Sequence, residues 1–416
     1  MNVFLIILVM VAFTPYVGSV VLHSLSFNYG TPRRSFESYI VGFSLGQLLL
    51  IKVITLLGVF GLINLNIITP TLLLFFIMAL ALDWRKGWAV AFRYLEITNF
   101  YNSPRHYKAT WLTVIITFIL GTAFLIDFTP PRHADVLRYH LEYSNYILNS
   151  GFLPFVPHNQ LALAADAELL FSMIIIGFGS GYVKLAVYVN LFFCILATFK
   201  YFEPFGPVVR KYAIGFFIAS PILFLASTIV KPDTIQLLYF IVSLLLINSL
   251  FQTFSVINLI LIAIFLGEVV SLKWTGIIPV LSLILYLIFL YLVKAENRKT
   301  LLYLVVAIGI AIVIIPSYWY VRNYLAIGNP IWPILSHLFM INDNSLLYEV
   351  STYDSSRSGV IEKYGFFGYL WYTFFIYKPS LFGGLGVSYY LSLPLAIYRN
   401  VDKKIIYNFV FVMIYM

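Results

Sequence analysis

Residues 256–293 read VINLILIAIFLGEVVSLKWTGIIPVLSLILYLIFLYLV, and this stretch decides the fold class. It contains two apolar runs, 256–272 and 276–293, with a short connection between them. A run of roughly 20 apolar residues matches the length of a helix that crosses the hydrocarbon core of a bilayer. The stretch therefore predicts two antiparallel membrane-spanning helices.

The whole chain has the same character. Of its 416 residues, 61% are hydrophobic and only 10% are charged, and the mean hydropathy is +0.93. A soluble domain is about half apolar and about a quarter charged. The composition excludes a soluble enzyme, a disordered chain and a coiled coil, because too few charges remain to form a surface facing water. The net charge of +9 indicates basic cytoplasmic loops rather than binding to nucleic acid.

We therefore expect an all-α fold, namely a polytopic transmembrane helical bundle of roughly 11–13 spans. The candidate spans are 3–23, 39–63, 67–82, 110–126, 183–201, 212–229, 234–251, 256–272, 276–293, 301–319, 380–398 and a last one that starts at Ile405. The last candidate has only 12 residues before the chain stops at Met416, too few to cross a bilayer. We expect the C-terminal region to be truncated.

Basic loops predict the orientation of the bundle. Loops 85–109 and 200–211 are rich in Lys and Arg, which places both in the cytoplasm. An even number of spans must lie between them, and two candidates already do. The apolar stretch 161–178, with Asp166 and Glu168 near its start, is therefore predicted not to cross the membrane. We expect it to be a juxtamembrane helix, interfacial or re-entrant, on the outer face.

The same alternation places the N-terminus and two long segments, 127–163 and 320–366, outside. If 134–149 is a helix, four polar side chains share one face, because they are three, four and seven positions apart. These four are Asp135, Arg138, Tyr139 and Glu142. Leu137, Leu141 and Leu148 form a neighbouring face suited to lipid, and His140 points elsewhere. The alternative is a surface helix whose Arg138–Glu142 pair contributes a few tenths of a kcal/mol.

Two more polar positions lie near the outer ends of spans. In Lys231-Pro-Asp233, proline and aspartate favour a helix start, and the lysine can extend to lipid headgroups. Alternatively, both charged residues belong to a functional site. Glu268 lies about one turn inside an apolar run, where an ionisable residue is a functional candidate unless it is paired. The alternative is a structural ion pair with Lys273 or Lys231.

The last polar position is Arg322-Asn323, which follows the aromatic residues around Trp319 and precedes a Gly328-Asn-Pro turn. Aromatic residues are usual at a membrane interface. Arg322 differs from them, because a guanidinium can bind a phosphate through two parallel hydrogen bonds.

The sequence contains no Walker A loop, dinucleotide-binding fingerprint, His-Glu-x-x-His motif or paired-cysteine zinc site. His133, His140 and His158 lie in the first outer segment at no recognised ligand spacing, so no metal site is predicted.

Four motifs occur in order: Pro-Pro followed by Asp135 and Tyr-His-Leu, then Lys231-Pro-Asp, then Lys273 in a helical hairpin, then Arg322-Asn followed by Gly-Asn-Pro. Together they resemble the GT-C superfamily of integral-membrane glycosyltransferases. The closest similarity is to its bacterial protein-mannosyltransferase-like and aminoarabinose-transferase-like branch. The resemblance implies a catalytic membrane core at 110–335, an N-terminal extension of three spans and a basic cytoplasmic loop at 1–109, and an outer loop with C-terminal spans at 336–416.

The resemblance also implies residue roles. Asp135 corresponds to the catalytic aspartate of the family, and Asp233 to its second outer-loop aspartate. The family places a second acid beside the first, whereas Val136 follows Asp135 here, which leaves Glu142 and Glu168 as candidates. The implied substrate-binding residues are Arg138, Tyr139, His140, Glu142, Lys231, Lys273, Arg322 and Asn323.

The implied reaction is the transfer of a sugar from a polyprenyl-phosphate donor to a hydroxyl of a glycan, lipid or protein. Asp135 acts as general base, basic residues neutralise the departing phosphate, and no cofactor is required. Tyr139 and the aromatics around Trp319 stack on sugar. The protein is expected in the cytoplasmic membrane, with its active site facing outside. The alternative is a transporter or flippase of lipid-linked sugars.

Overall fold

The protein is represented by a computed structural model that describes residues 9–26, 35–85, 111–131, 136–156, 164–218, 228–293 and 297–332. Within these ranges the chain is helical and contains no strand, so the expected all-α fold is confirmed. The helices are η1 (Val9–Phe13), α2 (Thr14–Ser26), α3 (Ser35–Val59), α4 (Leu65–Arg85), α6 (Trp111–Asp127), η3 (Val136–His140), α7 (Leu141–Ser150), α8 (Asp166–Phe178), η4 (Ser180–Tyr182), α9 (Val183–Tyr201), η5 (Glu203–Phe205), α10 (Pro207–Ile218), α12 (Asp233–Gln252), α13 (Val256–Leu272), η6 (Trp274–Gly276), α14 (Ile277–Val293), α15 (Arg298–Ile314) and α16 (Ser317–Ile327).

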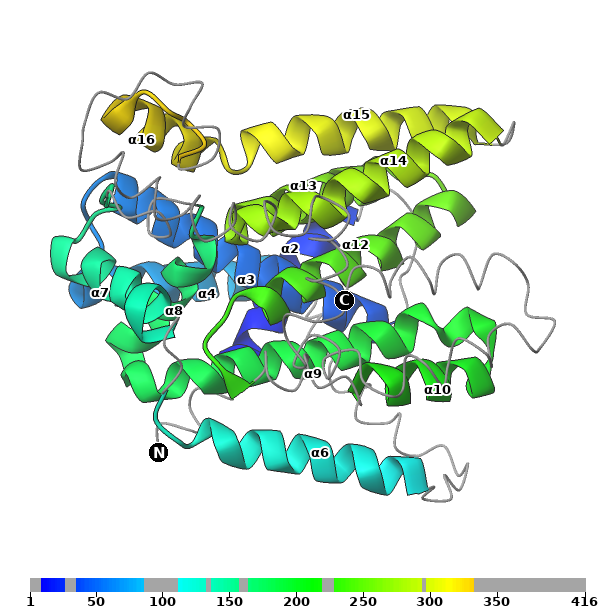
Figure 1. Cartoon of the computed structure of the whole chain (residues 1–416), viewed down its shortest axis with the longest axis horizontal. Coiled ribbons are helices and arrows are strands. Elements are labelled where there is room, and N and C mark those ends of the chain that lie inside the picture. The colour runs from blue at the N-terminus through cyan, green and yellow to red at the C-terminus, as the bar shows by residue number, and fades with distance from the viewer. Residues whose placement is uncertain are drawn as a thin grey trace, which may run out of the picture.

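The long helices run side by side along the length of the molecule (Figure 1). Helices α9, α12, α13, α14 and α15 form the bundle, and the short helices α7, α8 and α16 gather at one end of it, at the left of Figure 1. We call this the α7–α8–α16 end. It is also where α13 stops and where α12 and α14 begin, so several helix termini and their polar residues meet there.

Five helices in the described ranges are long and apolar enough to cross a membrane: α3, α4, α9, α12 and α14. A sixth is counted if α15 and α16, which meet at a bend of 41°, form one broken span. Large apolar side chains such as Leu73, Leu74 and Ile77 of α4 project outward. A lipid environment removes the cost of that exposure, so the chain is a multi-pass membrane protein.

These helices are fewer than the roughly 11–13 spans expected from the sequence. Each candidate as far as 301–319 falls at least partly on a helix, but α2, α6, α10 and α13 are too short, as described, to cross a membrane. The candidates at 380–398 and from Ile405 lie outside the described residues.

The helices predicted in the first outer segment are present as α7 and α8, and their place at the outer face of the membrane stays a prediction. Helix α8 has only 13 residues, and Asp166 through Ile174 are all buried. It therefore packs inside the protein, against α7 and α3, rather than lying on the lipid surface. The predicted lipid-facing leucine row is wrong for Leu141, which is buried in the core, whereas Leu137 is exposed.

The N-terminal segment belongs to the same hydrophobic core as the rest of the bundle. Helix α3 contacts α8, α9 and α12, and Phe43 of α3 stacks on Phe193 of α9 with ring centroids 3.6 Å apart. The boundary predicted at 109/110 therefore does not separate two packing units.

Glycine brings α2 and α3 into unusually close contact. A Cβ atom at Gly46 would lie 2.0 Å from the backbone oxygen of Thr14, and one at Gly18 would lie 1.9 Å from the oxygen of Gly42. Gly42 and Gly46 have the four-residue spacing that allows helix backbones to approach closely in membranes.

Candidate functional site

Ionisable side chains from different helices meet at the α7–α8–α16 end. They form three groups, which we call the Lys52 cluster, the His140 pair and the Asp233 pair after one member of each. A further cation, Arg322, lies nearby and contacts a separate set of residues. Charged groups inside a membrane bundle are costly unless they are paired, so the partners of each group determine its role.

The Lys52 cluster lies deepest. Lys52 Nζ of α3 is 2.5 Å from Asp166 Oδ2 of α8 and 2.6 Å from Glu268 Oε2 of α13. Both carboxylates are fully buried. One cation therefore bridges two acids, which leaves one excess negative charge when both are ionised.

Asp166 has a hydrogen-bond donor on each oxygen. The Ser271 hydroxyl donates to Oδ2, and the indole of Trp319 donates to Oδ1 over 3.0 Å. Glu268 is held by its ion pair with Lys52. The cluster thus ties α3, α8, α13 and α16 together.

Glu268 pairs with Lys52 rather than with Lys273 or Lys231, the alternative partners that the sequence offered, because α3 inserts its lysine beside α13. The Trp319 ring is 1% exposed and lies in the core, and the predicted stacking of the aromatics around it on a sugar stays a prediction. Lys52 itself was missed, although it is an isolated charge within the apolar run 39–63, which is the signal that could have revealed it.

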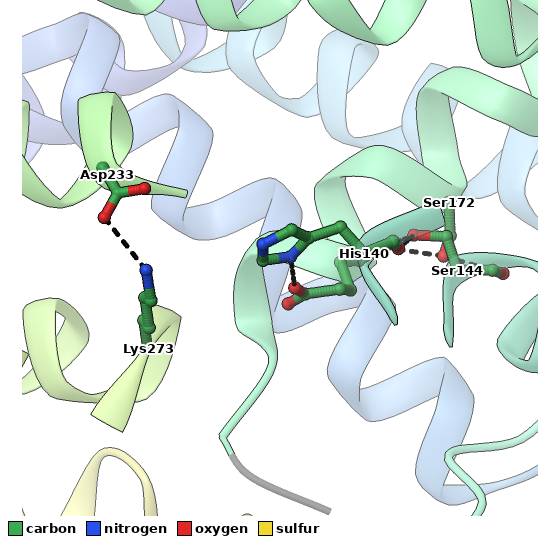
Figure 2. Close-up of polar contacts among 6 residues, drawn as sticks. His140, Ser144, Ser172, Asp233 and Lys273 are labelled. Carbon is green, nitrogen blue, oxygen red and sulfur yellow. Dashed lines mark hydrogen bonds and ion pairs between the residues drawn. The ribbon is translucent and has the colours of Figure 1, made fainter. Parts of the chain in front are cut away.

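The His140 pair joins η3 to α8. His140 Nδ1 lies 2.5 Å from Glu168 Oε1, and both side chains are buried. Ser144 donates to the backbone oxygens of His140, at 2.8 Å, and Glu168, at 3.1 Å. Ser172 donates to the backbone oxygen of Glu168 at 2.7 Å, as Figure 2 shows for this group of side chains. The two hydroxyls fix η3 and α7 against α8.

The Asp233 pair lies at the start of α12. Lys273 Nζ, just after α13, is 3.0 Å from Asp233 Oδ1. The side chains are 28% and 39% exposed, respectively, so this pair is the most accessible of the three groups. Gln236 Nε2 donates to the backbone oxygens of Val269 and Lys273, which holds the chain after α13 in place.

The imidazole of His140 lies between Glu168 and the Asp233 pair (Figure 2). Its Nδ1 faces Glu168, and its ring points Nε2 toward the side where Asp233 and Lys273 lie. The charges of His140 and Lys231 both act on the Asp233 carboxyl. The structure therefore brings together four residues that the sequence singled out, namely His140, Lys231, Asp233 and Lys273.

Arg322 lies in a different set of contacts. Its Nη1 donates to the Tyr143 hydroxyl at 2.5 Å and to the Pro154 oxygen at 3.2 Å, and its Nη2 donates to Asn323 Oδ1 at 2.8 Å. The guanidinium also lies 4.7 Å from the Trp319 ring centroid. In this structure Arg322 anchors α7 and the chain after it to α16, with Asn323 as its neighbour, and its predicted role in binding phosphate stays a prediction.

The first outer segment is described only in part. Asp135 and the side chain of Arg138 lie outside the described residues. Glu142 is exposed on α7. The Tyr139 ring is half-buried beside that of His140, with centroids 4.3 Å apart. Of the two candidates for a second acid, Glu168 is therefore the one that the structure places in the group of ionisable residues.

Within the described ranges no three His, Cys, Asp or Glu side chains are arranged to hold a metal ion. The arrangement that does exist is a buried imidazole and carboxylate beside an accessible acid and two lysines, at one end of a membrane bundle. No protein-family model, no curated protein and no solved structure matches this chain.

Proposed function

We propose that this protein is a membrane glycosyltransferase that moves a sugar from a polyprenyl-phosphate donor to an acceptor hydroxyl. The observation that carries the proposal is the exposed Asp233–Lys273 pair next to the buried His140–Glu168 pair. Acidic and basic side chains lie near one another at one end of the membrane bundle. Such a site suits a substrate with a charged headgroup and a lipid tail.

In the proposed reaction the acceptor hydroxyl attacks the anomeric carbon, and Asp135 takes the hydroxyl proton. The sugar leaves its phosphate, which gains negative charge as the bond breaks. Lys273 and Lys231, whose charges both act on Asp233, neutralise that charge. The described chain resumes at Val136, directly after Asp135, and continues through η3 to His140. The proposed base is therefore close in sequence to a residue of the site.

The proposed orientation places the α7–α8–α16 end outside the cytoplasm. The basic segments near 200–211 and 294–300 follow the opposite ends of α9 and α14, as the positive-inside rule requires of cytoplasmic loops. Nucleotide sugars are confined to the cytoplasm, so an outward-facing site takes a lipid-linked donor.

The test is transfer of labelled sugar from synthetic polyprenyl-phosphate sugars by the purified protein in lipid vesicles. Asp135→Asn keeps the size of the side chain but cannot take up a proton, so turnover should fall at least about a hundredfold. Glu203→Gln is the control, because Glu203 pairs with Lys200 at the other end of the bundle. Retention of transfer by Asp135→Asn would make Asp233 the next base to test.

One observation favours a second function, a transporter or flippase of lipid-linked sugars. The Lys52 cluster places three ionisable groups among the bundle helices, and such groups often line transport paths. The same vesicles discriminate the two functions. A flippase would move a labelled lipid-linked sugar between leaflets without forming any glycosylated acceptor. In that case neither the wild type nor Asp135→Asn would transfer sugar.

A further inference from the structure

The reaction proposed above does not use the buried His140–Glu168 pair. Glu168 is 8% exposed at its side chain and His140 is 3% exposed. An ionised carboxylate only accepts hydrogen bonds, so the Nδ1 atom 2.5 Å away carries a hydrogen and donates it. That contact fixes the orientation of the ring. The other ring nitrogen, Nε2, is buried and has no hydrogen-bond partner among the described residues.

A buried nitrogen without a partner costs free energy, and a functional site is one reason to keep it. Figure 2 shows that the ring directs this nitrogen to the side where Asp233 and Lys273 lie. The electrostatic interaction between His140 and Asp233 places them in the same neighbourhood. A phosphate bound at Lys273 would therefore lie on the side of the ring toward which Nε2 points.

We propose that His140 is a further catalytic residue, which donates its Nε2 hydrogen to the phosphate oxygen of the departing polyprenyl phosphate, and that Glu168 is its positioning residue. The inference rests on the proposed glycosyl transfer and assigns the leaving-group side of that reaction. The His140–Glu168 contact then has a catalytic role in addition to a structural one.

The atoms and electrons balance in a single displacement. The acceptor oxygen forms a bond to the anomeric carbon and gives its proton to Asp135. The bond from that carbon to the phosphate oxygen breaks, and its electron pair stays on the phosphate. The imidazolium transfers its Nε2 proton to that oxygen and becomes neutral. Asp135 and His140 then exchange these protons with solvent, and no further reactant is needed.

Three charged groups lie around the ring. Glu168 of α8 contacts Nδ1, whereas Asp233 of α12 and Lys273 after α13 lie on the side of Nε2. Glu168 is the nearest and the most deeply buried of the three.

The decisive variant is His140→Asn. The asparagine amide keeps a donor toward Glu168 but has no proton to give at the Nε2 position. With a polyprenyl-phosphate sugar we expect kcat to fall by at least about a hundredfold, with a small change in KM for the donor. We also expect the pH dependence of the residual activity to differ from that of the wild type.

Glu168→Gln provides an independent measurement. The ring loses the carboxylate beside Nδ1, so the pH dependence of transfer should differ from that of the wild type. Ser172→Ala is the matched control, because it loosens the same contact between α7 and α8 without touching ring or carboxylate. Its pH profile should keep the wild-type midpoint.

The outcomes separate this inference from the proposed function. If wild type transfers sugar and Asp135→Asn does not, but His140→Asn keeps the wild-type kcat and pH profile, the role of His140 is overturned alone. If wild type transfers no sugar from any polyprenyl-phosphate donor, both proposals fall. Should His140→Asn not fold, an unchanged pH profile in Glu168→Gln would overturn the inference.

Discussion

At the scale of single residues, Tyr143 shows how burial dictates a protonation state. Its hydroxyl donates to the Pro154 oxygen at 2.9 Å and accepts from Arg322 Nη1 at 2.5 Å. A phenolate could not donate, so this chain of contacts needs the neutral phenol. Burial raises the pKa of Tyr143 to about 12, although the Arg322 guanidinium acts to lower it.

The raised pKa predicts a loss of stability at alkaline pH. An unfolded tyrosine ionises near pH 10, whereas Tyr143 in the fold stays neutral to about pH 12. The unfolded state therefore releases its proton first, and the free energy of unfolding should decrease as the pH rises from about 10 to about 12. Denaturation in detergent at several pH values measures this. Tyr143→Phe should lack this part of the decrease, and an identical profile in both proteins would refute the assignment.

At the scale of elements, the contact between α2 and α3 depends on glycine. A methyl group at Gly46 would lie 2.0 Å from the backbone oxygen of Thr14, which cannot move without shifting the helix. We expect Gly46→Ala to lower the melting temperature in detergent, followed by far-UV circular dichroism.

The control for that change is Gly121→Ala in α6. A Cβ atom there has no neighbour within 4 Å, and alanine favours a helix over glycine by about 1 kcal/mol. Gly121→Ala should therefore maintain or raise the melting temperature. Equal effects at the two glycines would show that close backbone packing does not stabilise α2 against α3.

At the scale of the whole molecule, the orientation of the bundle is testable with single cysteines. The natural cysteine, Cys194, is fully buried and gives no background. Asn145 is exposed on α7, and Gln252 is exposed at the opposite end of α12. In intact cells an impermeant thiol reagent should label Asn145→Cys and leave Gln252→Cys unlabelled. The reverse pattern would place the proposed site in the cytoplasm.

Much of the fold could be predicted from the sequence, because a membrane-spanning helix satisfies its own backbone and its length is a local property. The apolar runs around 183–201 and 234–251 are observed as α9 and α12 almost residue for residue. The count of spans between two basic loops also predicted that 161–178 does not cross the membrane, and α8, with 13 residues, is too short to span one.

The composition and the apolar runs are enough to identify an all-helical membrane protein, and the motifs single out Asp233, Lys273 and His140. The pairing of the charges is known only from how the helices pack. Lys52 meets Asp166 and Glu268, and Arg322 meets Tyr143, across long separations in the chain. Helix periodicity relates only residues a few positions apart, whereas these partners are selected by how whole helices pack and by the cost of leaving a charge unpaired inside the bundle.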